Sequence, residues 1–137
     1  MRFNKLIPEL GVSDFENSLA FYTKILGFKK EYFREKFAFL SFQGSQIMIE
    51  QKNNNWKTGE LKHPFGRGIN FQIEVKDIEP IEKALKKNRH DLFRKPEDNW
   101  YRKANKLLGF RELLVQDPDG YLLRFSQKIG TKKIISP

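Results

Sequence analysis

Few side chains in this sequence could do chemistry, and three of them stand out. Glu50 and Glu112 are carboxylates that could act as a general acid or base, and Arg124 could stabilise an oxyanion beside either of them. The sequence has no cysteine, which excludes disulfides, zinc–cysteine sites and thiol nucleophiles. No nucleophile with a neighbouring base and no closely spaced carboxylate pair is visible. A metal-free acid/base enzyme is therefore one alternative that the sequence leaves open.

Arg124 lies near the end of the stretch VQDPDGYLLRF, Val115–Phe125. The residues Asp117–Gly120 are typical of a tight turn and separate two apolar runs, which predicts a β-hairpin. Successive side chains of a strand point to opposite faces, so Arg124 is expected on the face opposite to Leu123 and Phe125. An arginine at this place needs a partner or a ligand.

The chain contains two similar halves, about residues 5–51 and 68–127. In each half an apolar strand ends in Val-x-Asp-(Phe/Ile)-Glu, so that Asp14 in the first half matches Asp77 in the second. A helix is predicted to follow in each half. Asp77 is expected to cap the second helix, and either Asp14 or Ser13, the latter through a capping box, is expected to cap the first.

Each half then continues with strands, so that the order strand–helix–strand–strand–strand occurs twice. In the second half a short strand over residues 90–95 is expected to lead into an irregular stretch, residues 96–109, before the final hairpin. Residues 52–67 are rich in asparagine, glycine and lysine and are expected to form a linker. Since neither half has enough apolar surface alone, we predict the α+β class, with two βαβββ modules in a single domain over residues 1–137.

Two phrases in the right order resemble a known family. The stretch FYTKILGF, Phe21–Phe28, follows the first strand, and DPDG comes after the second repeat. Together they resemble the vicinal oxygen chelate superfamily, which includes glyoxalase I, extradiol dioxygenases, fosfomycin resistance proteins and bleomycin resistance proteins. The resemblance covers about Leu6–Gln127. It implies that the two modules form a U-shaped cleft and are paired in a dimer.

Enzymes of this superfamily hold one divalent metal with four side chains, usually His, Gln or Glu. The corresponding positions in this sequence are Ile7, Glu50, Asn70 and Arg124. Ile7 has no lone pair to offer, and the fixed positive charge of Arg124 would repel a metal ion. The resemblance therefore implies a cleft without metal or other cofactor. In that cleft Arg124 would pair with Glu50 or present its guanidinium to a ligand.

Among members of the superfamily, those lacking metal ligands are antibiotic-binding homodimers. They sequester bleomycin at the subunit interface without altering it. The resemblance implies a non-catalytic homodimer of this type, with a bleomycin-type antibiotic or another flat, polar molecule as ligand. Trp100 and Tyr101 are expected in a polar loop where they have no core to join. The residues expected to contact the ligand are Tyr32, Phe33, Phe37, Phe39, Glu50, Trp56, Asn70, Gln72, Trp100, Tyr101 and Arg124.

The charge balance bears on the partners. The chain has 26 lysines and arginines against 17 aspartates and glutamates, a formal net charge of +9. The basic residues are spread along the whole sequence and no helix presents a basic, aromatic face, so a nucleic-acid-binding module is only an alternative. Long-range attraction would favour an anionic or neutral planar ligand over cationic bleomycin.

Two further expectations follow from the sequence. No signal peptide and no run long enough to span a bilayer is visible, so a soluble, cytoplasmic protein without a membrane partner is expected. A metal-dependent glyoxalase- or dioxygenase-like enzyme with a rearranged site, using Glu50, Asn70 or a histidine, is the remaining alternative.

Overall fold

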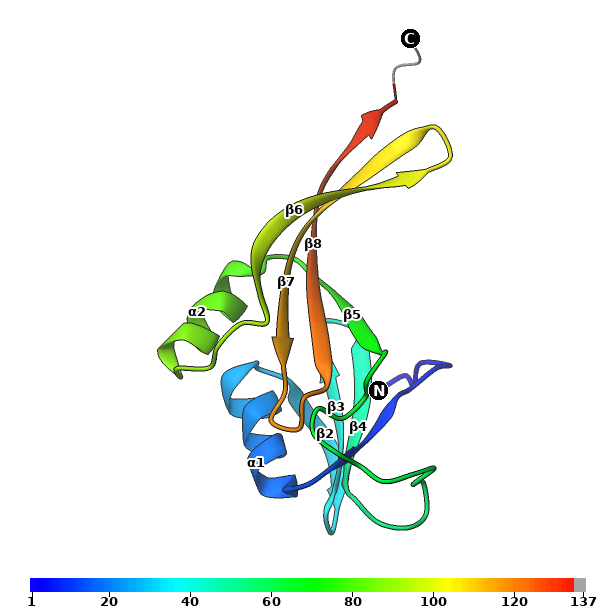
Figure 1. The fold of residues 1–137 in the computed structure, drawn as a ribbon, viewed down its shortest axis with the longest axis vertical. Coiled ribbons are helices and arrows are strands. Elements are labelled where there is room, and N and C mark those ends of the chain that lie inside the picture. Colours follow the sequence, from blue (N-terminus) through cyan, green and yellow to red (C-terminus); the bar gives the residue numbers. More distant parts are fainter. Residues whose placement is uncertain (135–137) are drawn as a thin grey trace. The chain divides into compact units, whose positions relative to one another are not determined.

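A computed structural model describes residues 1–134 of the chain. It contains two compact units, the first made of Met1–Ile69 with Gln116–Tyr121, and the second of Asn70–Val115 with the residues from Leu122 onward. Each unit holds one four-stranded sheet and one helical segment (Figure 1). The prediction of an α+β fold with two βαβββ modules is confirmed. No helix in the described part of the chain is long and apolar enough to cross a membrane.

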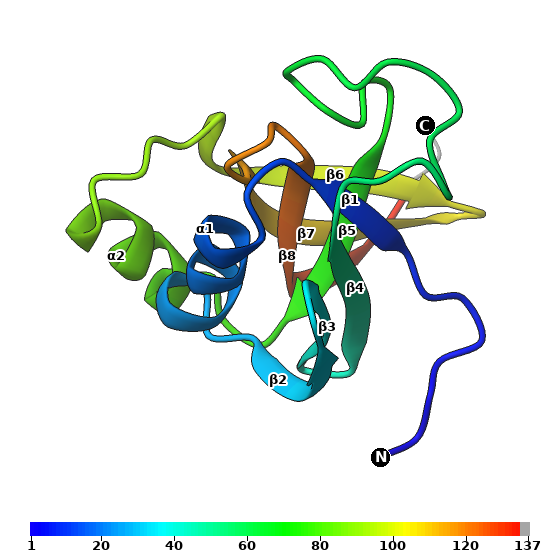
Figure 2. The same ribbon diagram turned by 90° about the horizontal axis from the view of Figure 1, so that it is seen from below.

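The first unit follows the predicted order. Its sheet has the strand order β1-β4-β3-β2, in which β1 is parallel to β4 and the other pairs are antiparallel. The helical segment contacts β4 and ends in a π-helical turn, η1 (Figure 2). The elements are β1 (Glu9–Val12), α1 (Phe15–Ala20), η1 (Phe21–Ile25), β2 (Lys29–Arg34), β3 (Phe37–Phe42) and β4 (Ser45–Gln51).

The start of α1 decides between the two predicted caps. Asp14 is the N-cap, and its carboxylate accepts a hydrogen bond from the backbone N–H of Asn17 at 3.2 Å. The capping box at Ser13 is wrong, because the Ser13 side chain donates to Asp119 instead. Gly27, directly after this helical segment, has a φ of 89°, a conformation that favours glycine.

The second unit repeats the plan. Its sheet has the order β5-β8-β7-β6, with β5 parallel to β8. The N-cap of the helix is Ile78 without a side-chain cap, so the prediction that Asp77 caps it is wrong by one position; the Asp77 carboxylate accepts from the N–H of Glu79. The elements are β5 (Asn70–Val75), α2 (Glu79–Lys87), β6 (Arg94–Lys103), β7 (Lys106–Gln116) and β8 (Leu122–Lys133).

The irregular stretch predicted for residues 96–109 is wrong. These residues form most of β6 and the first part of β7, which pair antiparallel from Glu97 opposite Glu112 to Lys103 opposite Lys106. The strand predicted over residues 90–95 begins only at Arg94. β6 is the outer strand of its sheet and most of its side chains are exposed, so it has no apolar alternation to reveal it.

Trp100 is therefore in a strand, and its ring lies across β7. A Cβ atom added to Gly109 would lie 2.5–2.8 Å from three atoms of that ring, so a larger residue would require the ring or the strand to shift. The same ring also lies near Gly130 of β8, and the ammonium of Lys132 lies 3.9 Å from the ring centroid. This tryptophan thus packs across β7 toward β8 rather than lying in a loop.

We expect Gly109→Ala to destabilise the chain by about 1–3 kcal/mol, because the added methyl overlaps the Trp100 ring and one of them must move. Urea unfolding followed by circular dichroism measures it. Gly59→Ala is the matched control, since no heavy atom lies within 4 Å of the added Cβ, and it should change stability by no more than about 0.5 kcal/mol. Equal stability of Gly109→Ala and wild type would mean that Trp100 is not packed over β7.

Each unit has its own apolar core. The side chains that are buried almost completely include Tyr22, Phe39, Leu40 and Ile49 in the first unit, and Leu85, Leu113, Leu123 and Phe125 in the second. Burying one such side chain stabilises a fold by roughly 1.5–3 kcal/mol. The segment 52–67, predicted as a linker, is part of the first unit: Phe65 is buried, and its N–H donates to the carbonyl of Asp119 at 2.8 Å.

The turn Asp117–Gly120 belongs to the first unit and is held there by hydrogen bonds. The buried hydroxyl of Tyr22 donates to the Asp117 carboxylate at 2.7 Å, and the backbone N–H groups of Asp119 and Tyr121 donate to its other oxygen at 2.9 and 3.0 Å. Burial raises the pKa of Asp117 from 3.8 to about 6, although these three hydrogen bonds oppose the shift. The motif therefore fixes the fold of the first unit rather than a ligand.

Candidate functional site

Arg124 is held on the second sheet by two polar partners. It lies on β8 directly opposite Gln72 of β5, and its Nη2 donates to Gln72 Oε1 at 2.8 Å. Its Nη1 lies 3.7 Å from the carboxylate of Glu112 on β7. Within the second unit, Glu112 on the neighbouring strand supplies the carboxylate beside Arg124, and the pairing of Arg124 with Glu50 of the first unit stays a prediction. In the first unit, the amide of Asn53 donates to Glu50.

Glu112 is the centre of this polar cluster. Its side chain is 2% exposed, and its two oxygens accept hydrogen bonds from the hydroxyls of Ser126 and Tyr101 and from the amide of Asn99. Burial alone would raise the pKa of Glu112, but the three hydrogen bonds and the Arg124 charge outweigh it and lower the pKa below its usual value. A carboxylate that holds its charge this firmly is a poor general base.

The cluster lies on one face of the sheet, as alternation along β8 predicted. Leu123 and Phe125 point to the other face and are buried almost completely, whereas Arg124 is partly exposed and Gln72 is exposed. Tyr101 keeps 43% of its surface exposed while its hydroxyl donates to Glu112, and this hydrogen bond together with burial raises the pKa of Tyr101. We call this surface the polar face and define it by Gln72, Asn99, Tyr101, Glu112, Arg124 and Ser126.

Three of the predicted ligand contacts, Gln72, Tyr101 and Arg124, are thus brought together on the polar face. Asn70 is exposed two residues before Gln72 on the same strand. Trp100, the next residue after Asn99 on β6, packs over Gly109 instead and is only partly accessible. Ligand contact by these residues stays a prediction.

The four aromatic residues predicted on β2 and β3 form a packed cluster in the first unit. Phe37 and Phe39 are 3% and 1% exposed. The ring of Tyr32 stacks on that of Phe39 at 5.1 Å between centroids, and the ring of Phe3 meets Phe39 edge-on at 5.3 Å. Phe33 is 66% exposed and lies 4.3 Å from the Lys30 ammonium. Of the four, Phe33 and Tyr32 are the ones that a ligand could reach.

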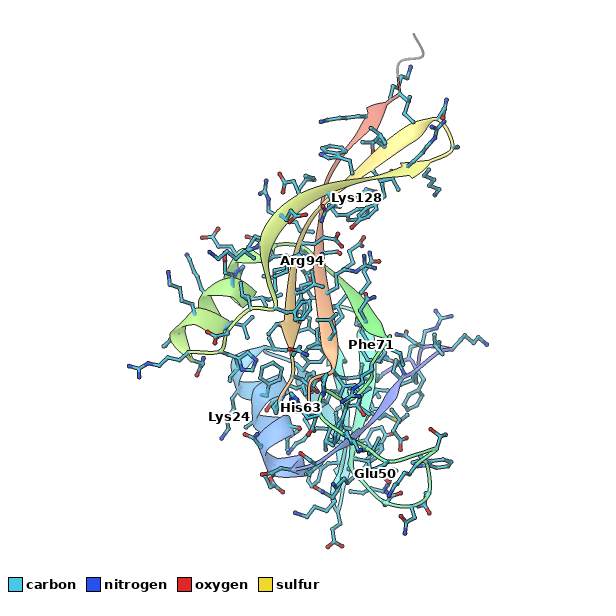
Figure 3. All side chains as sticks on the ribbon, in the orientation of Figure 1. Lys24, Glu50, His63, Phe71, Arg94 and Lys128 are labelled. Carbon is cyan, nitrogen blue, oxygen red and sulfur yellow. The ribbon has the colours of Figure 1, made fainter. Side chains whose placement is uncertain are left out.

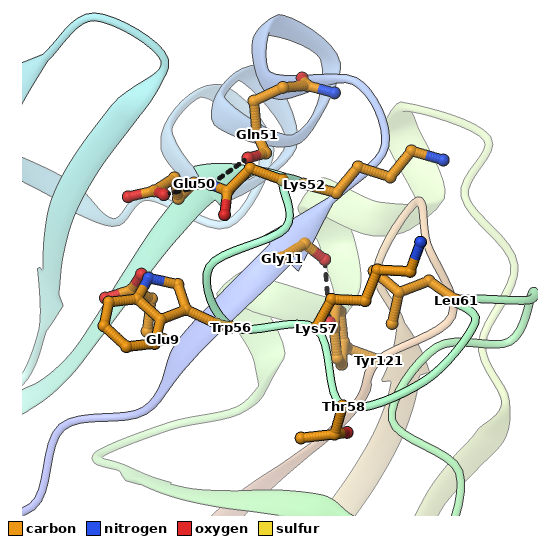
Figure 4. A pocket seen from close by; sticks show the side chains of 11 residues that line it. Glu9, Gly11, Glu50, Gln51, Lys52, Trp56, Lys57, Thr58, Leu61 and Tyr121 are labelled. Atoms are coloured by element: carbon orange, nitrogen blue, oxygen red, sulfur yellow. Dashed lines mark hydrogen bonds between the residues drawn. The ribbon is translucent and has the colours of Figure 1, made fainter.

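Glu50 and Trp56 line a pocket of about 140 Å³ in the first unit (Figure 4). Trp56 is 73% exposed. Burial and the nearby charge of Glu50 raise the pKa of Glu9 on the adjacent strand, partly offset by Arg34. The wall also contains Gly11, whose carbonyl accepts from the Tyr121 hydroxyl at 2.8 Å. The other lining residues are Gln51, Lys52, Asn53, Lys57, Thr58 and Leu61.

The residues at the four positions corresponding to the metal ligands of the superfamily do not fit a divalent ion. Ile7 has no donor atom, and the guanidinium of Arg124 is a donor of hydrogen bonds with no lone pair. Glu50 alone remains as a carboxylate. Among residues 1–134, no three side chains of histidine, aspartate or glutamate lie close enough together to hold a metal.

The polar face contains residues that sequence reasoning missed. Ser126 follows Arg124 at the strand period of two, so alternation could have placed it on the same face. Asn99 could not be found, because the strand that contains it was predicted as irregular. The sequence indicates Glu112 only as a candidate acid or base, and no local pattern identifies it as the partner of Arg124.

Comparison with known proteins places the chain in a family. The sequence model of the Glyoxalase/Bleomycin resistance protein/Dioxygenase superfamily matches residues 6–125. The chain therefore belongs to this superfamily, as its sequence motifs predicted. Among curated proteins, none is similar enough to count as a match.

Several solved structures are similar to the chain. A superfamily member from Vibrio splendidus 12B01 is 32% identical over 90% of this chain and 97% of that chain, with a TM-score of 0.43. TioX from Micromonospora sp. ML1 is 16% identical over 93% of this chain and 100% of that chain, with a TM-score of 0.72. A glyoxalase/bleomycin resistance protein/dioxygenase from Alicyclobacillus acidocaldarius is 18% identical over 95% and 96% of the two chains, with a TM-score of 0.66. The last two share the fold.

Proposed function

We propose that this protein is a metal-free, non-catalytic member of the superfamily, of the bleomycin-resistance type, which sequesters a flat, polar small molecule as a homodimer. The observation that supports it best is the state of Arg124. Its guanidinium stands where a metal ligand would be expected and is fixed by Gln72 and Glu112. The charges of Arg124 and Glu112 cancel, so this face suits an uncharged or weakly charged ligand.

The polar face has capacity left for such a ligand. The Arg124 guanidinium donates to Gln72 and lies 3.7 Å from the Glu112 carboxylate, and its side chain is still 28% exposed. The side-chain N–H₂ of the exposed Gln72 and the half-exposed ring of Tyr101 lie on the same surface. Together they offer hydrogen-bond donors and a ring for stacking. Glu112, by contrast, accepts three hydrogen bonds already and supports no proton-transfer chemistry.

The test is isothermal titration calorimetry with metal-free bleomycin, riboflavin and flavin mononucleotide, the last two being one ring system without and with a negative charge. We expect micromolar or tighter binding of at least one compound, its recovery unchanged by mass spectrometry, and a protein dimer on a sizing column. Gln72→Ala should weaken this binding about three- to tenfold, the value of one hydrogen bond. Glu74→Ala, an exposed neighbour on the same strand, is the matched control and should leave it unchanged.

Other results would overturn the proposal. A stoichiometric bound metal in the purified protein, or a chemically altered ligand after incubation, would indicate an enzyme. A Gln72→Ala variant that binds as tightly as wild type would remove the polar face from the site and leave the pocket at Trp56 as the alternative.

A further inference from the structure

The structure gathers basic residues that the sequence spreads out. Beyond the end of β5, strands β6, β7 and β8 continue as a ribbon past the rest of the second unit (Figure 1, yellow and red). We call this ribbon the arm and define it as residues 100–109 and 128–134. It contains six lysines and arginines and no aspartate or glutamate: Arg102, Lys103, Lys106, Lys128, Lys132 and Lys133. Its net charge of +6 compares with +9 for the whole chain.

All six cationic side chains are exposed, and they come from three strands. The pairing of β6 with β7 continues to Lys103 opposite Lys106, next to the turn at the tip. The backbone N–H of Ile134 donates to the carbonyl of Asn105 at 3.1 Å, which ties the end of β8 to the same tip. Figure 3 shows side chains projecting from the arm beyond Lys128. Lys132 and Lys133 therefore lie close to the tip as well.

This arrangement is unfavourable in the isolated protein. Like charges directly opposite each other on neighbouring strands destabilise a sheet, and Lys103 faces Lys106 in the register. No ion pair relieves either of them within residues 1–134. A polyanion laid along the arm would neutralise these charges and remove the repulsion.

We propose that the arm is a binding surface for double-stranded nucleic acid, which it contacts mainly through the phosphates. The major groove of a DNA duplex, about 12 Å wide, admits a two-stranded β-ribbon. The β6–β7 hairpin at the end of the arm is such a ribbon, and the end of β8 is tied beside its turn. Lysines neutralise phosphates without reading sequence. The observations favour nucleic acid over an acidic protein, because lysine is depleted from protein–protein interfaces and the Trp100 ring is already occupied by Lys132.

The test is fluorescence anisotropy of a labelled 20-base-pair DNA duplex with the full chain at increasing salt. If all six cations contact phosphates, raising the salt from 50 to 200 mM should weaken binding about a thousandfold. Lys103→Gln/Lys106→Gln should bind more weakly at 50 mM salt and lose only about a hundredfold over the same range, as expected for four contacts. Lys86→Gln/Lys87→Gln changes the net charge equally on exposed residues of α2 and should behave as wild type.

Four results would overturn the inference. They are an absence of binding at 50 mM salt with the protein at 100 µM, an equal loss in both double variants, equal competition by polyglutamate of the same charge, and tighter binding to vesicles of anionic phospholipid. The third would indicate an acidic protein as partner and the fourth a membrane surface. Thermal unfolding of both variants verifies that they fold, which replacement of exposed lysines should allow.

Discussion

Glu112→Ala is expected to destabilise the protein by about 2–4 kcal/mol, somewhat less than when a fully buried charge pair loses one partner, because the Arg124 side chain is 28% exposed. The truncation leaves Arg124 without its carboxylate and the fully buried hydroxyl of Ser126 without an acceptor. Tyr101 and Asn99 lose the same acceptor but can turn to water, since both are partly accessible. Most of the cost therefore comes from the buried hydroxyl of Ser126, and a smaller part comes from the partly exposed Arg124.

Two further variants separate the causes. Glu112→Gln keeps the shape and one acceptor oxygen but loses the charge, and we expect it to cost about 1–3 kcal/mol. Glu97→Ala is the matched control, because Glu97 is opposite Glu112 in the register but exposed; it should change stability by no more than about 0.5 kcal/mol. The free energy of unfolding from urea titration measures all three. A Glu112→Ala variant as stable as Glu97→Ala would show that the cluster does not form.

The pH dependence of the same carboxylate has a defined sign. Because the pKa of Glu112 is lowered in the folded chain, the unfolded chain binds its proton more readily. The stabilisation is fully present above the ordinary glutamate pKa of about 4.5 and is lost as the pH falls through the lower folded value. Glu112→Gln should lack this loss, so its stability relative to wild type should improve below pH 4.

The sequence predicted the parts of the site that depend on local period. The turn residues Asp117–Gly120 define the hairpin, and alternation along β8 places Arg124 opposite Leu123 and Phe125, as observed. The duplicated Val-x-Asp motif located both helices and therefore both modules. These features need only a few neighbouring residues, and each has a physical reason that acts at short range.

The rest of the site depends on contacts between strands distant in sequence. The carboxylate beside Arg124 in the second unit lies on another strand, and only the strand order, which puts β7 next to β8, identifies it as that of Glu112. The sequence does not predict β6, because a strand at the edge of a sheet with both faces exposed needs no alternation of apolar residues. Missing β6 also hid the arm, whose charge gathers only when β6, β7 and β8 are aligned.

Asp117→Asn is expected to remove one contribution to the pH dependence of stability, the one that comes from the proton of Asp117 in the first unit. The folded chain raises the pKa of Asp117 from 3.8 to about 6, so between these values the folded chain binds the proton more tightly than the unfolded chain. The stability that this proton provides is present below pH 4 and is lost as the pH rises through 6, an effect of about 3 kcal/mol for a shift of this size. An asparagine carries no such proton.

The asparagine should also preserve the structure of the turn. Its carbonyl oxygen can accept the N–H groups of Asp119 and Tyr121, as the carboxylate does, and its N–H₂ can donate to the Tyr22 hydroxyl, which rotates to accept. The difference in unfolding free energy between variant and wild type should therefore shift by roughly 2.4 kcal/mol in favour of the variant from pH 4 to pH 7. Titrations of Glu112 and other groups cancel in that difference. Asp91→Asn, at an exposed aspartate, is the control for the removal of a surface carboxylate. If the difference in unfolding free energy between Asp117→Asn and wild type does not change with pH, Asp117 has the same pKa in the folded and unfolded chains.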